Sequence, residues 1–336
     1  MQFLVTGAAG FIGHRIALAL LEAGHSVVGI DNLNAYYDVE LKRARLRRLL
    51  PFGQFRFQEL DIADHEGLMA IPERNTIDRV VHLAAQAGVR YSIENPFAYA
   101  SANLTGHLSI LEFCRRSERA PMLVYASSSS VYGNSNDVPY TEEAVINNPV
   151  SLYAATKRAD ELMSQAYAKL YGLKQVGVRF FTVYGPWGRP DMALFKFTKA
   201  ILAGETIQVF NHGQHRRDFT YVDDIVEGVI RILDRPVLGN SDWNSDQPDP
   251  GTSRAPWRVY NIGNNSPVEL MDYIDALERS LGRKAKVEYL PLQPGDVPDT
   301  YADLEDLVQQ FCYKPSTPIS QGISSFVAWY HDYFKR

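Results

Sequence analysis

Phe3-Leu4-Val5-Thr6-Gly7-Ala8-Ala9-Gly10-Phe11-Ile12-Gly13 opens the chain with an apolar run, a glycine turn and the start of a helical pattern. The helical pattern continues to Glu22, and its apolar positions recur at helical spacing: Ile12, Ile16, Leu20 and Leu21. A second apolar run, 26–30, ends at Asp31. Strand, glycine turn, helix and strand in this order predict one βαβ unit.

The glycine turn has the spacing G-x-x-G-x-x-G, through Gly7, Gly10 and Gly13. Glycine suits a tight turn that a pyrophosphate approaches closely, and the N–H groups at the start of the next helix favour an anion. Asp31 lies about 20 residues on, where a carboxylate can bind the adenosine ribose hydroxyls and repels a 2′-phosphate. Three glycines alone can simply make a turn. With the strand, the helix and Asp31 beside them, they predict a site for NAD rather than NADP.

Strand-like and helix-like stretches alternate through the first half of the chain, with further strands predicted at 55–60, 79–84, 122–126 and 175–179. Such alternation indicates an α/β protein with a Rossmann-type, doubly wound parallel sheet. The pattern loosens after Val183, and 240–256 has the composition of an exposed loop. We expect an NAD-binding lobe at 1–182, to which 218–262 returns. We expect a smaller α/β substrate lobe at 183–217 and 263–336, with helices at 268–281 and 320–334.

Composition limits the function classes. The net charge of −5 gives no reason to expect a nucleic-acid partner. The only two cysteines, Cys114 and Cys312, lie far apart in sequence, so a disulfide framework is not expected and a reducing compartment is favoured. No secretory signal is recognisable, and no apolar run approaches the roughly 20 residues of a membrane span. We therefore expect a cytoplasmic protein without a membrane partner. No histidine or cysteine spacing indicates a metal site.

Tyr153 and Lys157 stand four residues apart in a helical stretch, so both side chains lie on one helix face. A free phenol has a pKa near 10 and is a poor base, but a neighbouring ammonium group lowers that pKa. Such a tyrosine can remove a hydroxyl proton while a hydride leaves the same carbon. Ser128, near the end of a predicted strand, can share that proton. Tyrosine and lysine at helical spacing are also common on solvated faces, and the run Ser127–Ser130 can equally be a polar loop.

Taken together, these motifs resemble the extended short-chain dehydrogenase/reductase family and, within it, the nucleotide-sugar epimerases. The resemblance runs nearly end to end and is closest to UDP-glucuronate 4-epimerases. It is carried by the glycine turn and by Asp31-Asn32, Asp61-Ile62, His82-Leu83-Ala84-Ala85, Asn103, Ser127–Gly133, Tyr153-x-x-x-Lys157 and Arg216-Arg217-Asp218-Phe219, and in the subgroup by 86–92, 183–192 and 293–297.

The resemblance implies a mechanism. Tyr153 takes the sugar 4-hydroxyl proton, with Ser128 sharing the hydrogen bond, and hydride passes to tightly bound NAD⁺. The 4-keto sugar then turns and takes the hydride back on its other face, which interconverts UDP-glucuronate and UDP-galacturonate. The implied NAD contacts are Gly7, Gly10, Phe11, Ile12, Gly13, Asp31, Asn32, Asp61, Ile62, Leu83, Ala84, Ala85, Asn103, Tyr153, Lys157 and Phe180.

Departures from neighbouring subfamilies narrow the choice. Related sugar 4,6-dehydratases carry an acidic pair where this chain has Ser129 and Ser130, and UDP-glucuronate decarboxylases usually carry glutamate at Ser130. UDP-galactose epimerases have an arginine before Pro-Gly-Asp, where this chain has Gln293. The resemblance therefore favours epimerisation over dehydration or decarboxylation, and it leaves more of the diphosphate charge to Arg217 and another basic residue.

A hexuronic acid brings a carboxylate that needs a cation or several donors when it is desolvated. Arg189, in a loop after a strand end, and Arg90 are candidates. Arg189 can instead stack on Trp187, and Arg217 can instead pair with Asp218. Asp223 is predicted to cap a helix. The expected substrate contacts are Arg90, Ser128, Ser129, Ser130, Tyr153, Thr182, Arg189, Gln208, Val209, Phe210, Arg217 and Asp296.

Three other functions remain open. A UDP-glucose or UDP-N-acetylhexosamine 4-epimerase uses the same chemistry on a neutral sugar, and a UDP-glucuronate decarboxylase shares the 4-keto intermediate. A non-catalytic NAD-binding sensor is the third, although sensors commonly lose the Tyr/Lys pair. The apolar-patterned helices around 104–113 and 152–170 are candidates for a homodimer interface, but the same spacing also serves an intramolecular core.

Overall fold

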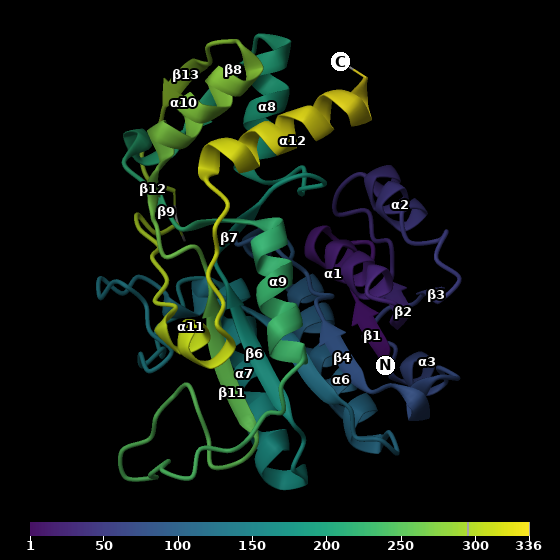
Figure 1. Cartoon of the computed structure of the whole chain (residues 1–336). Helices are drawn as coiled ribbons and strands as arrows, with labels where there is room; N and C mark the ends of the chain where they lie inside the picture. Colours follow the sequence, from purple (N-terminus) through teal and green to yellow (C-terminus); the bar gives the residue numbers. More distant parts are fainter. Residues whose placement is uncertain (294–295, 336) are drawn as a thin grey trace.

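The computed structural model describes residues 1–293 and 296–335. Its centre is a parallel sheet of seven strands in the order β11-β6-β5-β4-β1-β2-β3 (Figure 1). The strands are β1 (Gln2–Thr6), β2 (Ser26–Asp31), β3 (Phe55–Glu59), β4 (Arg79–His82), β5 (Met122–Ser128), β6 (Gln175–Phe180) and β11 (Trp257–Ile262). The order reverses between β1 and β4, which is where ligands bind in doubly wound sheets.

Side chains alternate across this sheet because successive residues of a strand point to opposite faces. Phe3 and Val5 pack in one core with α1 and α9, whereas Leu4, between them, packs in a second core with α6. The helices around the sheet are α1 (Phe11–Glu22), α2 (Val39–Arg47), α3 (His65–Met69), α4 (Tyr91–Glu94), α5 (Pro96–Tyr99), α6 (Gly106–Arg116), α7 (Leu152–Tyr171), α9 (Val222–Leu233) and α11 (Glu305–Phe311), with shorter turns η1 (Arg74–Thr76), η2 (Ala100–Thr105) and η3 (Ser129–Tyr132).

A second group of elements lies above the carboxyl ends of the strands (Figure 1). It pairs β8 with β13, β9 with β12 and β10 with β7. Its elements are β7 (Thr182–Tyr184), α8 (Ala193–Ala203), β8 (Thr206–Val209), η4 (Phe210–Gly213), β9 (Arg216–Arg217), β10 (Phe219–Tyr221), β12 (Val268–Glu269), α10 (Leu270–Leu281), β13 (Lys286–Tyr289) and α12 (Ile319–Phe334).

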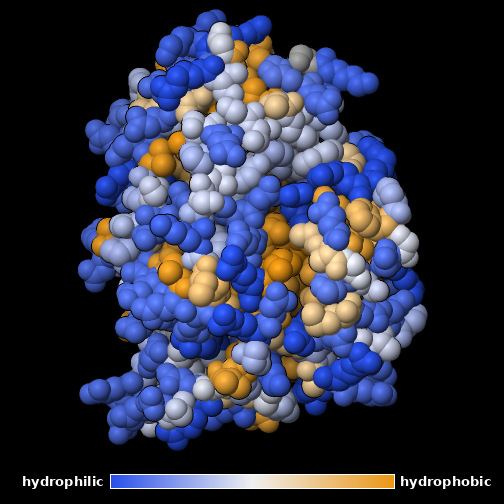
Figure 2. All heavy atoms as spheres, in the orientation of Figure 1, coloured by the Kyte–Doolittle hydropathy of each residue, from blue (hydrophilic) through white to orange (hydrophobic). Residues whose placement is uncertain are grey.

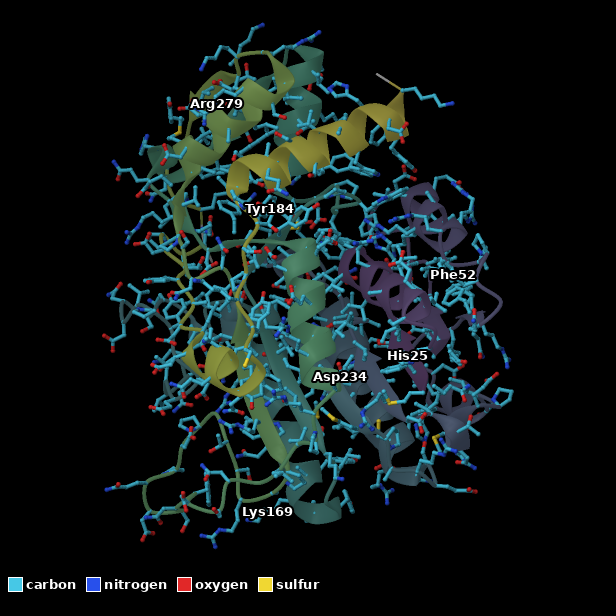
Figure 3. All side chains as sticks on the ribbon, in the orientation of Figure 1. His25, Phe52, Lys169, Tyr184, Asp234 and Arg279 are labelled. Carbon is cyan, nitrogen blue, oxygen red and sulfur yellow. The ribbon has the colours of Figure 1, made fainter. Side chains whose placement is uncertain are left out.

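Tyr184 marks the junction between the two groups. Figure 3 places it below α12 and above the sheet, whereas Arg279 and Lys169 lie toward opposite ends of the molecule. Its ring contacts Phe219, Tyr221 and Tyr273 edge-on. Aromatic packing of this kind contributes beyond buried area, and here it joins β7, β10 and α10 of the upper group to one another.

The α/β fold with a doubly wound parallel sheet is confirmed, and two local predictions need correction. Val268 and Glu269 form β12, and α10 begins at Leu270, because the pair bonds to β9. Asp223 does not cap α9. Tyr221 holds the cap position, and Asp223 lies in the first turn, where its carboxylate pairs with Arg15.

Two hydrophobic cores correspond to the two lobes that the sequence predicts. β11 joins the main sheet, and α9 packs against α1 beside it. A second core, built from α8, α10 and α12, belongs to the upper elements. Leu307, Phe311 and Tyr313 of the C-terminal part pack in the sheet core instead. We therefore propose the predicted lobe boundaries with two changes: α11 returns to the NAD-binding lobe, and β10 pairs with β7 in the upper group.

The surface is mainly hydrophilic in the view of Figure 2, with an apolar strip where α1 and α9 lie side by side. Ile12, Ala19 and Ile230 are partly buried residues that pack on the core there. Among the described residues, no helix combines the length and the apolar character that crossing a membrane requires.

Candidate active site

One large cavity opens at the carboxyl ends of β1, β2, β4, β5 and β6. Segments far apart in the sequence meet there, because the ends of parallel strands share one edge of a sheet. Its lining includes Gly7, Gly10, Phe11, Ile12, Gly13, Asp31, Asn32, Asp61, Ile62, Leu83, Ala84, Ala85, Ser128, Tyr153, Lys157, Phe180 and Arg189. Fifteen of the sixteen expected NAD contacts are in this set; Asn103 is the exception.

The glycine turn fits a bound pyrophosphate. Gly7 has a φ of +72°, and a Cβ there would lie 2.9 Å from the Ala84 nitrogen. A Cβ on Gly13 would lie 2.0 Å from the Gly7 oxygen, so the helix could not pack this close with any side chain there. No side chain caps the start of α1. Its first N–H groups are therefore left to a ligand, and an anion is the ligand they favour.

Asp31 ends β2 in the position expected for a ribose contact. It is 8% exposed. Its Oδ2 accepts from the Ala9 nitrogen at 3.1 Å, and its Oδ1 accepts from the Leu33 nitrogen at 2.9 Å. Each oxygen keeps lone-pair capacity for a hydroxyl donor. Burial raises the pKa of Asp31, and nearby Lys42 opposes the rise. These residues, with the glycine turn, suit the adenosine half of NAD.

Sequence reasoning missed three polar residues of the same wall: Asn34, Tyr36 and Lys42. The Lys42 ammonium donates to the main-chain oxygen of Asn34 at 2.9 Å and to its Oδ1 at 2.8 Å. The sequence offers only a weak indication that Lys42 belongs to this site, because it stands among other basic residues of a helix. Only the fold turns its side chain inward.

Tyr153, Lys157 and Ser128 face this one cavity. Tyr153 and Lys157 stand one turn apart at the start of α7, where Ser151 caps the helix by accepting from the Ala154 nitrogen at 3.1 Å. The Lys157 ammonium donates to the main-chain oxygen of Ala126 at 2.9 Å. Ser128 ends the neighbouring β5. A phenol, an ammonium and a hydroxyl at one strand end form the arrangement needed to move a carbinol proton.

The serine run turns sharply into η3. Ser130 donates its N–H to Ser128 Oγ at 3.2 Å. Ser129 and Ser130 are half-buried and do not line the large cavity. Ser127 lines the cavity, and its hydroxyl donates to the buried Glu161 at 2.6 Å. The residues of this turn, Ser127–Ser130, therefore carry hydroxyls and no carboxyl group.

Arg189 lines the large cavity and a smaller one next to it, which Thr182 also lines. Its guanidinium makes two hydrogen bonds to Asp191, at 3.0 and 2.6 Å. The Tyr36 hydroxyl donates to the same carboxylate at 3.2 Å. Arg189 is therefore already paired beside the cavity, and the alternative of an arginine stacked on Trp187 is not what the contacts show. Arg48 lies over that ring instead.

Most of the remaining expected substrate residues lie outside the large cavity. Arg217 pairs with Asp296 at 2.8 Å, not with Asp218, whose carboxylate accepts N–H groups of Asn264, Asn265 and Ala302. Arg90 lies 4.9 Å over the Phe210 ring, Gln208 is exposed, and Val209 is fully buried. Pro294 and Gly295 of the expected 293–297 motif fall outside the described residues.

Asn103 lies behind the cavity wall. It is 1% exposed, and its Oδ1 accepts from the Gln86 nitrogen at 2.8 Å. Its Nδ2 donates to Thr156 on α7 at 2.9 Å. These contacts join the segment after β4 to the catalytic helix. Within residues 1–293 and 296–335, no group of three or more histidine, cysteine or acidic side chains is placed to hold a metal ion.

Comparison with known proteins agrees with this geometry. The model of the NAD dependent epimerase/dehydratase family matches residues 3–263. The chain belongs to this family. It is similar to protein CapI of Staphylococcus aureus, at 51% identity over the full length of both chains. It is 46% identical to UDP-glucuronate 4-epimerase 2 of Arabidopsis thaliana, over 100% of this chain and 77% of that one.

A solved relative has the same architecture. The crystal structure of UDP-glucuronic acid 4-epimerase from Bacillus cereus, in complex with UDP-glucuronic acid and NAD, superposes with a TM-score of 0.86. It is 31% identical and covers 99% of this chain and 100% of its own. The family relationship makes NAD the cofactor of this chain.

Proposed function

We propose that this protein inverts the 4-hydroxyl carbon of UDP-glucuronate and so interconverts UDP-glucuronate and UDP-galacturonate. The observation that carries the proposal is the meeting of Tyr153, Lys157 and Ser128 in the cavity that the glycine turn and Asp31 also line. The named relatives, 46% and 31% identical, act on or bind this substrate class and support the uronate.

The chain's own residues supply the proton chemistry. Tyr153 accepts the 4-hydroxyl proton and later returns it, while Ser128 holds the substrate oxygen. Lys157 stabilises the phenolate by its charge. NAD⁺, when bound, supplies the nicotinamide carbon that accepts the hydride and gives it back, so no net oxidation occurs. The remaining proposed cofactor contacts are those of the cavity wall, with Asn103 supporting the wall from behind.

The serine turn favours epimerisation. Elimination of water from a keto sugar needs a positioned acid and base, and Ser129 and Ser130 provide neither. We propose that these hydroxyls, with Thr182 and Arg189, receive the sugar carboxylate. Arg189 would then exchange or share its pairing with Asp191, because a buried anion needs compensating donors.

The UDP half is assigned to the upper elements. We propose that Arg217, held by Asp296, binds the diphosphate and that Gln208, Val209 and Phe210 border the uracil. Val209 is fully buried, so it supports this border from within the core. Arg90, lying over Phe210, links the two sides of this region.

Product analysis by NMR on a panel of UDP-sugars tests the function. We expect UDP-glucuronate to yield UDP-galacturonate, and UDP-glucose and UDP-N-acetylglucosamine to turn over much more slowly. Predominant turnover of a neutral sugar would replace the uronate with that sugar. UDP-pentose as the main product would identify a decarboxylase, and no turnover at all would favour the NAD-binding sensor.

We also propose a homodimer in the cytoplasm. Large apolar side chains are exposed on neighbouring helices: Ile93 on α4, Phe97 on α5, Leu108 on α6 and Leu162 on α7. Contiguous exposed apolar surface of this kind marks an interface. Both cysteines are free, and Cys312 is exposed, which suits a reducing compartment.

A further inference from the structure

Lys157 has a charged neighbour that the proposed mechanism does not use: Asp160, one turn further along α7. Asp160 is 1% exposed, and its Oδ2 accepts a hydrogen bond from the Lys157 ammonium at 3.2 Å. Its other oxygen, Oδ1, is buried and has no hydrogen-bond partner among the described residues. A carboxyl group removed from water is thus placed directly against the ammonium that serves Tyr153.

This contact fixes the direction of the ammonium group. A lysine ammonium has three donors. Asp160 and the main-chain oxygen of Ala126 take two of them, at 3.2 and 2.9 Å. Because Lys157 also lines the large cavity, its third donor remains for that side. Asp160 therefore anchors Lys157 from behind, away from the reacting groups.

The contact also sets the local charge. The titratable and charged groups around Asp160 come from four elements: Lys157, Arg158 and Glu161 on α7, His107 on α6, Tyr125 on β5 and Arg179 on β6. Burial holds the pKa of His107 well below its usual range, so it is neutral. Glu161 is balanced by its hydrogen-bonded pair with Arg179.

Among the neighbours, Asp160 is therefore the group whose charge can change near neutral pH. Burial raises the pKa of Asp160 to about 7, and Lys157 opposes the rise. Below that pH the acid is neutral, and Lys157 acts on Tyr153 with its full charge. Above it, the carboxylate offsets part of that charge.

We propose that Asp160 is a positioning residue of this active site, whose carboxyl group holds the Lys157 ammonium and sets how much positive charge Tyr153 experiences. The proposal rests on the proposed role of Tyr153 as proton acceptor. A cation beside a phenol favours the phenolate and weakens it as a base. An ionised Asp160 reduces this effect, because its negative charge offsets part of the positive charge of Lys157.

The variant Asp160→Asn separates charge from shape, because its amide keeps an oxygen that accepts from Lys157. The pKa of Tyr153 is measured by NMR on protein with ¹³C at the tyrosine Cζ, with and without NAD, and its signal is assigned by its loss in Tyr153→Phe. We expect Asp160→Asn to lower that pKa by about 0.5 to 1 unit. The acid limb of kcat/KM should move to lower pH by a similar amount.

Asp306→Asn is the matched control. Asp306 makes an ion pair with Arg258 that is partly exposed and does not line the cavity. The Asp306→Asn variant should leave the Tyr153 pKa unchanged. If Asp160→Asn fails to fold, the unaltered protein still gives a test, because its Tyr153 signal should respond to a group that titrates near pH 7.

Two results would overturn the proposal. One is an unchanged or raised Tyr153 pKa in a folded Asp160→Asn protein. A carboxyl group with a purely structural role would give this result, because its loss would lower the stability of the protein without lowering the Tyr153 pKa. The other is the absence of any response near pH 7 in the unaltered protein when the variant does not fold. The titration needs no substrate. If the Tyr153 pKa shifts as expected but the protein does not epimerise UDP-glucuronate, the result would therefore contradict only the proposed function.

Discussion

At the scale of single residues, Tyr153 depends on neighbours that are remote in sequence. Its ring meets Tyr99 edge-on, with centroids 6.1 Å apart, and the Tyr99 hydroxyl donates to the main-chain oxygens of Ala87 and Gly88. Gly88 has a φ of +101°, a conformation that side chains rarely adopt. The loop after β4 therefore holds Tyr99, whose ring packs against the ring of Tyr153.

Replacing the base tests this arrangement. Tyr153→Phe removes one hydroxyl and should lower kcat by about 10²- to 10⁴-fold, the usual loss when a general base is removed. NAD content and melting temperature should stay near those of the parent, because the ring contacts remain. Steady-state assays with a direct measurement of bound NAD check this. A variant that epimerises near the parent rate would show that another group is the base.

Glu142 is a second buried carboxyl group, 6% exposed, and it accepts from the Asn261 nitrogen at 2.6 Å. Burial raises its pKa to about 7. A raised pKa means that the folded protein binds a proton more tightly than the unfolded chain, so this residue lowers the free energy of unfolding as pH rises from about 4.5 to 7.

The free energy of unfolding of Glu142→Gln, measured relative to that of the parent, should therefore be higher at pH 8 than at pH 5. We expect a difference of about 1 to 3 kcal/mol, measured by urea unfolding at both pH values. Glu143→Gln, one residue on, is the control. An equal effect of pH on Glu142→Gln and on the parent would contradict the assignment.

At the scale of elements, α7 carries Tyr153 and Lys157, two of the three residues that we propose for catalysis. It runs for 20 residues from the Ser151 cap to Gly172, which ends it in a left-handed conformation. Within it, Glu161 binds Arg179 of β6 and Ser127 of β5. This buried network joins the helix of Tyr153 to the strand of Ser128, so the two catalytic elements hold a fixed distance.

The helix cap provides a direct test at this scale. Ser151→Ala removes the acceptor for the Ala154 nitrogen and should cost about 1 kcal/mol of unfolding free energy. Because the first turn contains Tyr153, we also expect a fall in kcat that exceeds any change in KM. Ser151→Thr, which keeps a capping hydroxyl, should restore both. Full activity and stability in the alanine variant would show that the first turn is held by other contacts.

At the scale of the whole molecule, the chain crosses between the sheet and the upper elements several times. The buried Arg45 shows the coupling: it donates to the main-chain oxygens of Ala9 in the glycine turn and of Trp187 and Gly188 in the substrate-side loop. The glycine turn and the loop at 187–188 are therefore parts of one hydrogen-bonded unit.

The proposed dimer is tested at this scale. Leu108→Glu combined with Leu162→Glu should convert a dimer to a monomer, because each change places a charge in apolar surface that the partner would bury. Sedimentation velocity measures the result. Leu238→Glu is the control, since Leu238 is 71% exposed in a loop outside these helices. A parent protein that is itself a monomer would exclude the dimer.

The sequence by itself determined the α/β class, the glycine turn, the NAD-favouring Asp31 and the Tyr153–Lys157 pair. These features are local, because each depends on spacing within one strand, turn or helix. Only the tertiary structure decided that Arg217 pairs with Asp296, that Arg189 is held by Asp191 and that Lys42 and Asp160 turn inward. Such pairings depend on which distant segments meet at the strand ends, and helical or strand periodicity carries no information about that.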